Sequence, residues 1–517
     1  MLGRIDQPLR LFDISFVLFD TLVCLLGLIV LLGLLFSIYY RTSFSYRYPS
    51  MKQYVNFLTL YIVSFFVLIG FYSPEVVEES AFGFITGTWA TLLVTILSIL
   101  FYIYYVGYAF YTIRNAQYSM DYSFLQLAIY LAVLVIVFST NFIIIYLALE
   151  LLNFCAYVLA GAERHSLLSV EAALKYFVLS SVSAGFMLFG ISFIYGSTGG
   201  LLDILDVARC CLLSGVSPVS DSNNIYLLIG IFLLIIGLLF KIGVVPFHFW
   251  IIDVYAGSPL IITFFFSVFP KFGILFLLYK LSFFWSYGQV GDLLQFMYLT
   301  TSLLCLLLGS IGALAQTTIK RLLAYSAISN IGYVMFCFSS GTAEYMLYGF
   351  IYFLTYVIML YGIFLLLVWV SSSNENVDLD NLYDFVGIGF LNKPIAILLS
   401  SFLLGLSALP PFLPFFSKLL IVQLCLDSNA FISLFVILLN SIITVVFYLK
   451  LINLLLFENS LPFINSLGYL GYWDGFYAGY FAKSVLFFIW LAACVSIILP
   501  FYFGELLFVL SQHLWFI

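Results

Sequence analysis

Six lysines and one glutamate lie inside apolar stretches of this sequence. A lysine at the middle of a bilayer costs about 2.5–3.5 kcal/mol on insertion scales, so it must face a protein interior or a hydrated cavity. Burial favours a neutral amine and a nearby carboxylate favours an ammonium group, so a lysine held between these effects can accept and release a proton. The residues are Glu150, Lys175, Lys241, Lys271, Lys393, Lys418 and Lys450. Their chemistry indicates proton conduction across a membrane.

For four of these residues we favour a functional role over a structural one: Glu150, Lys241, Lys271 and Lys418. Each of the three lysines lies close to one or more prolines, which interrupt helices. Interrupted helices expose backbone carbonyls and admit water. Glu150 lies in IIIYLALELLNF, with apolar neighbours on every face. We therefore expect these four side chains to take part in proton transfer.

The remaining charged candidates have stronger structural alternatives. Lys393 and Lys450 lie near the ends of apolar stretches, where a long side chain reaches the membrane surface. Lys175 follows Glu171 by four residues, so a stabilising pair on one helix face competes equally with a functional role. His248, in VVPFHFW, is either a proton relay, which we favour slightly, or a structural histidine at a helix break.

The composition requires a polytopic membrane protein. Hydrophobic residues make up 64% of the 517 residues and charged residues only 8%, against about 25% charged in an average soluble chain. This excludes a soluble enzyme and a disordered chain. The net charge of -6 offers no basic surface for phosphates, so a nucleic-acid partner is excluded as well. The apolar runs are long and lack period-2 alternation, so they predict helices and not a barrel.

The apolar runs predict about 14 transmembrane helices, each needing about 20 residues. The expected spans are 14–38, 55–72, 82–112, 121–138, 141–160, 170–197, 225–246, 258–280, 291–314, 321–338, 343–370, 386–425, 430–457 and 484–508. The twelfth is too long for one straight crossing and contains Pro410-Pro411, so we expect two half-helices. The seventh resembles it, because Pro246 follows Lys241 closely. The stretches 198–224 and 371–385 are expected to be loops.

Lysine and arginine in the loops predict the orientation, since these residues favour the matrix or cytoplasmic side. Loops after odd-numbered spans hold Arg41, Arg47, Lys52, Arg114, Arg164, Lys320, Arg321 and Lys483, and the other side holds Arg4, Arg10, Arg209 and Lys280. Both termini should therefore lie opposite the matrix or cytoplasm. No removable targeting segment is expected at the N-terminus. The bias to Phe, Leu, Ile and Tyr favours AT-rich mitochondrial coding.

The sequence lacks the motifs of redox and nucleotide chemistry. No dinucleotide-binding glycine motif or P-loop occurs, and no cysteine set fits an iron–sulfur cluster. The three histidines are too scattered for a metal site, and the eight cysteines are most simply small buried hydrophobic residues. We therefore expect no cofactor or metal in this chain, and an ion gradient or partner subunits must supply the energy.

Four motifs resemble the NADH dehydrogenase subunit 2 family, the antiporter-like membrane subunits of respiratory complex I. They are KIGVVPFHFWIIDVYAGSP with SVFPKFG (241–273), EAALKYFVLSS with FGISFIYGSTG (171–199), KRLLAYSAISNIGY (320–333) and LSALPPFLPFFSK (406–418). Together they span about half of the chain, from residue 171 to residue 418, in register and order. Related antiporter-like subunits lack the run from Asp253 to Pro259, which points to subunit 2.

The resemblance implies a role for each matching residue. Glu150 matches the helix-5 carboxylate and Lys241 the helix-7 lysine, which together form a modulating ion pair. Lys175, Lys271 and Lys418 match the family lysines of helices 6, 8 and 12. Two departures stand out: Asn330 occupies a helix-10 position that is often His, and Leu413-Pro414-Phe415-Phe416 replaces the usual glycines before Lys418.

The resemblance also implies an antiporter-like fold with two inverted five-helix repeats and broken helices 7 and 12. Residues 1–120 would then hold helices 1–3 with their connecting loops. Residues 121–280 would form the first repeat (helices 4–8) and residues 281–457 the second (helices 9–13). Residues 458–517 would hold a loop and helix 14.

The implied function is that of a core membrane-arm subunit of proton-pumping NADH:ubiquinone oxidoreductase. As part of this enzyme it would translocate protons, while FMN, iron–sulfur clusters and ubiquinone would be bound by partner subunits. The expected partners are a neighbouring antiporter-like subunit, small membrane subunits, supernumerary subunits and lipids. The expected location is the mitochondrial inner membrane, or else a bacterial plasma membrane. The alternatives are a stand-alone Mrp-type cation/proton antiporter subunit and a structural scaffold.

Overall fold

The computed structural model describes residues 121–163, 165–214, 221–285, 288–373, 381–391 and 393–458. These residues are nearly all helical, and eight of their helices are long and apolar enough to cross a membrane. The chain is therefore a multi-pass membrane protein, as its composition predicts. The expected spans 14–38, 55–72, 82–112 and 484–508 lie outside the described residues.

The described helices follow one another with short connections. In chain order they are α4 (Asp121–Phe138), α5 (Phe142–Ala160), α6 (Leu167–Thr198), α7 (Ile204–Ser214), α8 (Asp221–Ile242), α9 (Phe249–Gly257), α10 (Leu260–Phe284), α11 (Gly288–Leu314), α12 (Ile319–Phe338), α13 (Ala343–Ser373), the 3-10 turn η1 (Leu382–Phe385), α14 (Ile388–Leu391), α15 (Lys393–Leu406), α16 (Leu413–Asp427) and α17 (Phe431–Leu456).

Most expected spans in this region begin and end within a few residues of an observed helix, but two expectations were wrong. The stretch 198–224, expected to be a loop, contains the helix α7. The seventh span, in which a break near Pro246 was expected, consists of α8, which ends at Ile242, and the separate short helix α9. Both short helices lie outside the long apolar runs that identify a span. Pro270 was expected to disrupt its helix, yet α10 continues through it from Leu260 to Phe284.

Two short non-helical segments, called interruptions here, each divide one helix from the next and each contain a proline. Residues 243–248 divide α8 from α9, and residues 407–412 divide α15 from α16. Each contains a residue with positive φ, Gly243 at 78° and Ala408 at 57°, three positions before Pro246 and Pro411. Proline lacks a backbone donor, so the helical hydrogen-bond ladder cannot run through these segments unchanged. Within the first interruption the Val245 amide instead donates to the sulfur of Cys305, and in the second the Phe412 amide donates to the Leu409 carbonyl oxygen.

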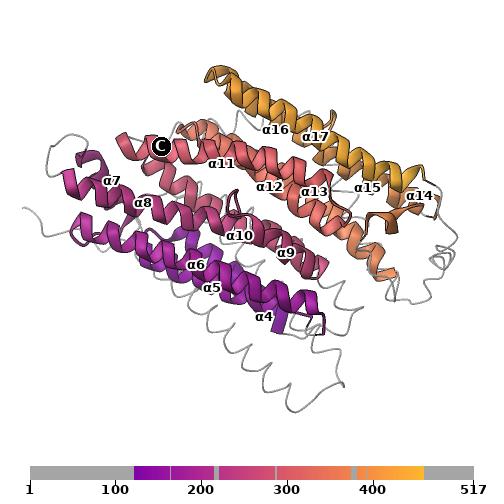
Figure 1. Ribbon diagram of the computed structural model, residues 1–517, viewed down its shortest axis with the longest axis horizontal. Coiled ribbons are helices and arrows are strands. Elements are labelled where there is room, and N and C mark those ends of the chain that lie inside the picture. Colours follow the sequence, from indigo (N-terminus) through magenta and orange to yellow (C-terminus); the bar gives the residue numbers. More distant parts are fainter. Residues whose placement is uncertain are drawn as a thin grey trace, which may run out of the picture.

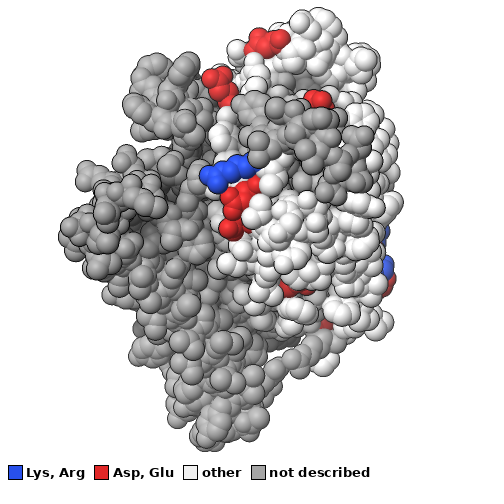
Figure 2. Space-filling model, turned by 90° about the vertical axis from the view of Figure 1, so that its left-hand side faces the viewer, with Lys and Arg blue, Asp and Glu red and all other residues white. Residues whose placement is uncertain are grey.

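The described helices lie side by side along a common direction, with α4–α6 at one edge and α16–α17 at the other (Figure 1). Where α6 crosses α8, a Cβ atom on Gly190 would lie 2.7 Å from the Gly230 carbonyl oxygen, so only glycine allows this approach. Charged side chains are sparse on the described part of the side shown in Figure 2. This exterior suits a hydrocarbon environment.

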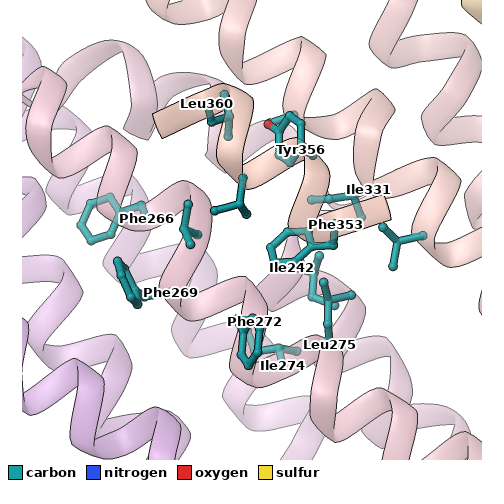
Figure 3. Packing of buried hydrophobic residues seen from close by; sticks show 14 of the residues in the cluster. Ile242, Phe266, Phe269, Phe272, Ile274, Leu275, Ile331, Phe353, Tyr356 and Leu360 are labelled. Carbon is teal, nitrogen blue, oxygen red and sulfur yellow. The ribbon is translucent and has the colours of Figure 1, made fainter. Parts of the chain in front are cut away.

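The central helix is α10, the most completely buried of the eight candidate spans. Figure 3 shows Phe266, Phe269 and Phe272 of α10 packed near Phe353 of α13 and Ile331 of α12. Aromatic side chains bury large apolar areas, so this packing fixes α10 against both neighbours. The polar groups of these three helices are thereby held at the centre of the described bundle.

Lys280 is a buried helix-capping residue and not the loop residue that the orientation count assumed. It is 3% exposed, and its ammonium group donates to the backbone oxygens of Val137 and Ser139, at the C-terminal end of α4. A cation at a helix C-terminus satisfies orphan carbonyls and the negative end of the helix dipole. Without Lys280, the loop count favours the same orientation more strongly.

Replacing Lys280 with Met should destabilise the protein. The substitution keeps most of the side-chain volume but leaves buried carbonyls unpaired, which costs about 1–3 kcal/mol. Lys280→Arg should retain much of the stability, and Lys450→Met, at an exposed position on α17, is the control. Thermal unfolding of the protein in detergent tests this; equal melting temperatures for the two Met variants would contradict the capping role.

Candidate proton-transfer site

Lys241 and Glu150 form a largely buried ion pair between α8 and α5. Lys241 Nζ lies 3.3 Å from Glu150 Oε1, which also accepts a hydrogen bond of 3.3 Å from Asn153 Nδ2. The two side chains are 3% and 20% exposed. The sequence places Lys241 in the last turn before the interruption at 243–248. The carboxylate therefore compensates a charge that apolar surroundings would otherwise penalise.

Lys271 is buried near the middle of α10 without a carboxylate partner. It is 3% exposed, and its Nζ makes no hydrogen bond to the described residues. The ammonium group lies 5.5 Å from the ring centre of Tyr255 on α9. Cys305 of α11 lies within electrostatic reach, and its sulfur accepts a 3.1 Å hydrogen bond from the Val245 amide in the interruption. Lys271 therefore faces the segment that connects α8 and α9.

Lys418 has a similar environment on α16. It is 8% exposed, and its Nζ lies 4.9 Å from the ring centre of Tyr333 on α12, with no hydrogen bond to the described residues. An aromatic face stabilises a cation by about 0.5–2 kcal/mol, less than the loss of hydration at a buried site. Lys271 and Lys418 thus differ from Lys241 in lacking a fixed counter-charge.

Lys175 lies apart from these three lysines. Its ammonium group is 2.7 Å from both Glu171 Oε1 and Asp253 Oδ2, and its side chain is 42% exposed. The expected pair with Glu171 is present, and the contact with Asp253 adds a clamp between α6 and α9. Lys393 and Lys450 are exposed, which fits their expected position near helix ends.

His248 occupies the last position of the first interruption. It is 8% exposed, its ring centre lies 4.4 Å from that of Phe249, and its Nδ1 has no hydrogen-bond partner among the described residues. No ion pair joins it to an acid among the described residues. His248 is therefore an available proton acceptor beside the break.

Sequence reasoning missed a set of buried polar residues around Lys271 and Lys418, defined here as the tyrosine cluster. Its members are Tyr255, Asn330, Tyr333, Tyr352, Tyr356 and Asn440. The chain holds 38 tyrosines, so tyrosine content alone gives no signal. Two pairs of residues did carry a sequence signal, because their spacing of three or four residues places both members on one helix face. These pairs are Asn330 with Tyr333, and Tyr352 with Tyr356.

No group of three or more potential metal ligands occurs among the residues that the structure describes. The cysteines in this part of the chain are free, and five of them are buried. The arrangement of Lys241, Lys271, Lys418 and the tyrosine cluster is suited to holding and passing protons.

Residues 139–444 match the family described as NADH:quinone oxidoreductase/Mrp antiporter, TM. This range includes both interruptions and all four residues of the predicted proton path. The chain belongs to this family. The resemblance drawn from the sequence motifs is confirmed.

Two curated relatives extend the match. The NADH-quinone oxidoreductase subunit N of Rhodospirillum rubrum is 30% identical over 354 residues, covering 68% of this chain and 71% of the relative. The NADH-ubiquinone oxidoreductase chain 2 of Marchantia polymorpha is 30% identical over 430 residues, covering 82% and 86%. Homologues of this chain are therefore antiporter-like membrane subunits of an NADH-quinone oxidoreductase.

The fold is shared with a solved archaeal respiratory complex. A chain of the membrane-bound sulfane sulfur reductase superposes with a TM-score of 0.77 at 20% identity, covering 95% of this chain and 96% of that chain. Similarity at this low identity establishes the fold alone.

The buried ion pair predicts strong coupling between its two members. Glu150→Gln leaves the Lys241 charge without its partner, so it should lower the free energy of unfolding by up to about 3–5 kcal/mol. The partial exposure of Glu150 makes the loss smaller than for a fully buried pair. Lys241→Met should be destabilising too, but the double variant should recover much of the loss.

Unfolding of the four forms in detergent gives the coupling energy, which should fall within about 0.5–3 kcal/mol. Glu171→Gln with Lys175→Met is the matched cycle on an exposed pair and should show weaker coupling, since solvent screens it. Additive effects of Glu150→Gln and Lys241→Met would show that the pair makes no net contribution.

Proposed function

We propose that this chain is a core membrane-arm subunit of a proton-pumping NADH:quinone oxidoreductase, in which it translocates protons. The observation that carries the proposal is the presence, in one membrane-embedded helical bundle, of a lysine paired with a carboxylate, Lys241, and of two buried lysines with no partner among the described residues, Lys271 and Lys418. Family membership supports the same function. A scaffold alone has no need of ammonium groups that are expensive to bury.

The proposed mechanism begins at the Glu150–Lys241 pair. A conformational or electrostatic signal from partner subunits moves the carboxylate away from the ammonium group. Lys241 then loses the charge that stabilises its proton and releases it through bound water toward Lys271 and Lys418. Return of the carboxylate favours reprotonation of Lys241. Each transfer against the membrane potential must overcome about 2.3 kcal/mol per charge per 100 mV.

Lys175 and His248 are proposed as further members of the path. Lys175 is partly exposed and held between two carboxylates, so it can exchange protons with the surface. His248 lies beside the interruption, close in sequence to Lys241. We assign Lys175 to the entrance and His248 to the connection with the break.

The proposed architecture is a pair of inverted repeats, residues 121–280 and 281–457, with α8–α9 and α15–α16 as broken helices. The interruptions at 243–248 and 407–412 support this pairing. So do two isolated β-bridges in corresponding connections: Asn141 with Asp203 flanks α5 and α6, and Thr318 with Asn381 flanks α12 and α13. Residues 1–120 and 458–517 would add the outer helices.

The oxidation of NADH and the reduction of quinone are assigned to partner subunits, which would bind FMN, iron–sulfur clusters and ubiquinone. The proposed neighbours are another antiporter-like subunit, small membrane subunits, supernumerary subunits and lipids. We propose the mitochondrial inner membrane as the location, with the bacterial plasma membrane as the alternative. Both termini would lie opposite the matrix or cytoplasm.

An Mrp-type cation/proton antiporter subunit is the second candidate, because the matched family includes such subunits. Copurification separates the two. A complex I subunit travels with flavin and iron–sulfur proteins on a native gel stained for NADH oxidation, whereas an antiporter subunit travels with other transporter subunits. A purely structural scaffold predicts that neutralising the buried lysines changes assembly but leaves the proton-to-NADH ratio intact.

Variants of the assembled complex test the pumping role. Lys241→Ala, Glu150→Gln, Lys271→Ala and Lys418→Ala should each slow proton transfer through this subunit about 100-fold or more, since each removes a group that holds or controls the proton. Lys450→Ala, at an exposed position, should have no effect. The readout is NADH-driven acidification of vesicles relative to NADH oxidised. An unchanged ratio in both Lys241→Ala and Glu150→Gln would refute the proposed roles.

A further inference from the structure

We propose that tyrosine hydroxyls carry protons between Lys271 and Lys418, with Asn330 and Asn440 as positioning residues. The inference rests on the proposed function and names the groups that perform its middle step. The tyrosine cluster joins α9, α12, α13 and α17 between the two uncompensated lysines. Each of its six members is at most 5% exposed.

The path leaves Lys271 at Tyr255. The ammonium group lies 5.5 Å from the Tyr255 ring centre, and the Tyr255 hydroxyl makes no hydrogen bond to the described residues. Tyr356 on α13 holds another buried hydroxyl that makes no hydrogen bond to the described residues. Figure 3 shows Tyr356 among the buried side chains, near Phe353 and Leu360 of the same helix. Tyr255 and Tyr356 therefore bring the path from α9 to α13.

Asn330 holds the middle of the path. Its Oδ1 accepts a hydrogen bond of 2.6 Å from the Tyr352 hydroxyl, and its side chain lies beside the Tyr356 hydroxyl. Tyr352 and Tyr356 are four residues apart, so both hydroxyls face α12 from one side of α13. An amide does not readily release and regain a proton, so Asn330 positions the Tyr352 hydroxyl and is not itself a carrier. For a proton to pass, the Tyr352 hydrogen turns from the Asn330 oxygen to the next acceptor, and the Tyr356 hydroxyl has no hydrogen-bond partner among the described residues that would hold it.

The path ends at Lys418 through Tyr333. The Tyr333 and Tyr352 ring centres are 5.1 Å apart, and Lys418 Nζ lies 4.9 Å from the Tyr333 ring centre. The Tyr333 hydroxyl accepts a hydrogen bond of 2.9 Å from Asn440 Nδ2. Since Asn440 is the donor in that bond, the hydroxyl hydrogen of Tyr333 is left to point elsewhere. Asn440 thus fixes the oxygen and leaves the proton of Tyr333 transferable.

The chemistry of the step balances without an oxidant or a reductant. A hydroxyl oxygen accepts a proton on a lone pair and releases its own hydrogen to the next acceptor. Water bridges the gaps that exceed a hydrogen bond, as it does around other buried polar groups. The Lys271 ammonium becomes an amine and the Lys418 amine becomes an ammonium. One proton moves, and every tyrosine returns to its neutral form.

Structural packing alone does not explain this choice of residues. Phenylalanine, of which the chain has 58, fills nearly the same volume without a hydroxyl to satisfy. Burying a hydroxyl without full hydrogen bonding costs about 1–3 kcal/mol. Several hydroxyls gathered between two lysines therefore point to a use for their oxygen atoms.

The test uses the assembled complex in sealed vesicles, with Tyr333→Phe and Tyr352→Phe. Each variant removes one oxygen and keeps the ring, so assembly on a native gel should be unchanged. The ratio of protons pumped to NADH oxidised should fall to the value of Lys418→Ala. Tyr333→His should recover part of the ratio, because imidazole also accepts and releases protons. The control is Tyr298→Phe, a fully buried tyrosine on α11 outside the cluster.

A normal ratio in both Phe variants, with a reduced ratio in Lys418→Ala, would overturn the tyrosine path and leave the proposed function standing. A normal ratio in Lys418→Ala itself would refute the proposed function. A normal ratio in one Phe variant removes that hydroxyl from the path, and failure of both to assemble would assign the hydroxyls to stability and overturn the carrier role.

Discussion

The high free energy of an ammonium group inside a membrane is the constraint on which the rest of the structure depends. Lys280 meets it with backbone carbonyls, and the three lysines of the proposed proton path meet it in two other ways. Lys241 is compensated by the Glu150 carboxylate at 3.3 Å, whereas Lys271 and Lys418 lie over tyrosine rings. The energy of an ion pair changes strongly when the carboxylate moves, whereas the weaker attraction between an ammonium group and an aromatic ring changes little. The Glu150–Lys241 pair is thus the part of the path most responsive to a signal from outside.

The sequence predicted the spans in the described region well, because a helix that crosses the lipid bilayer needs an uninterrupted apolar run of matching length. It named Glu150 and Lys241 as candidates, since a charge in an apolar run is conspicuous, and the ion pair that the family resemblance implied is present at 3.3 Å. Lys280 was misplaced because span ends are uncertain by a few residues, enough to turn a buried cap into a loop residue. Pro270 was misread because a proline within a helix does not always end it.

The sequence could not predict which residues meet in the tyrosine cluster, for a different physical reason. Asn330 and Tyr352 meet because α12 packs against α13, and Asn440 reaches Tyr333 from α17, more than 100 residues away in the chain. Helical spacing identifies which residues share a face, but it does not identify the helix opposite. The clamp of Lys175 by Asp253 was missed likewise, since α6 and α9 are joined only by tertiary packing.

The short helix α9 connects the groups that would otherwise act separately. Over nine residues it carries Asp253, which binds Lys175, and Tyr255, which faces Lys271. Its Trp250 donates a 2.9 Å hydrogen bond to the Phe240 carbonyl oxygen, next to Lys241. α9 therefore contacts the surroundings of all three lysines, and the interruption at 243–248 separates it from α8, which carries Lys241. The position of this one short helix is thus set jointly by the break and by contacts to Lys175 and Lys271.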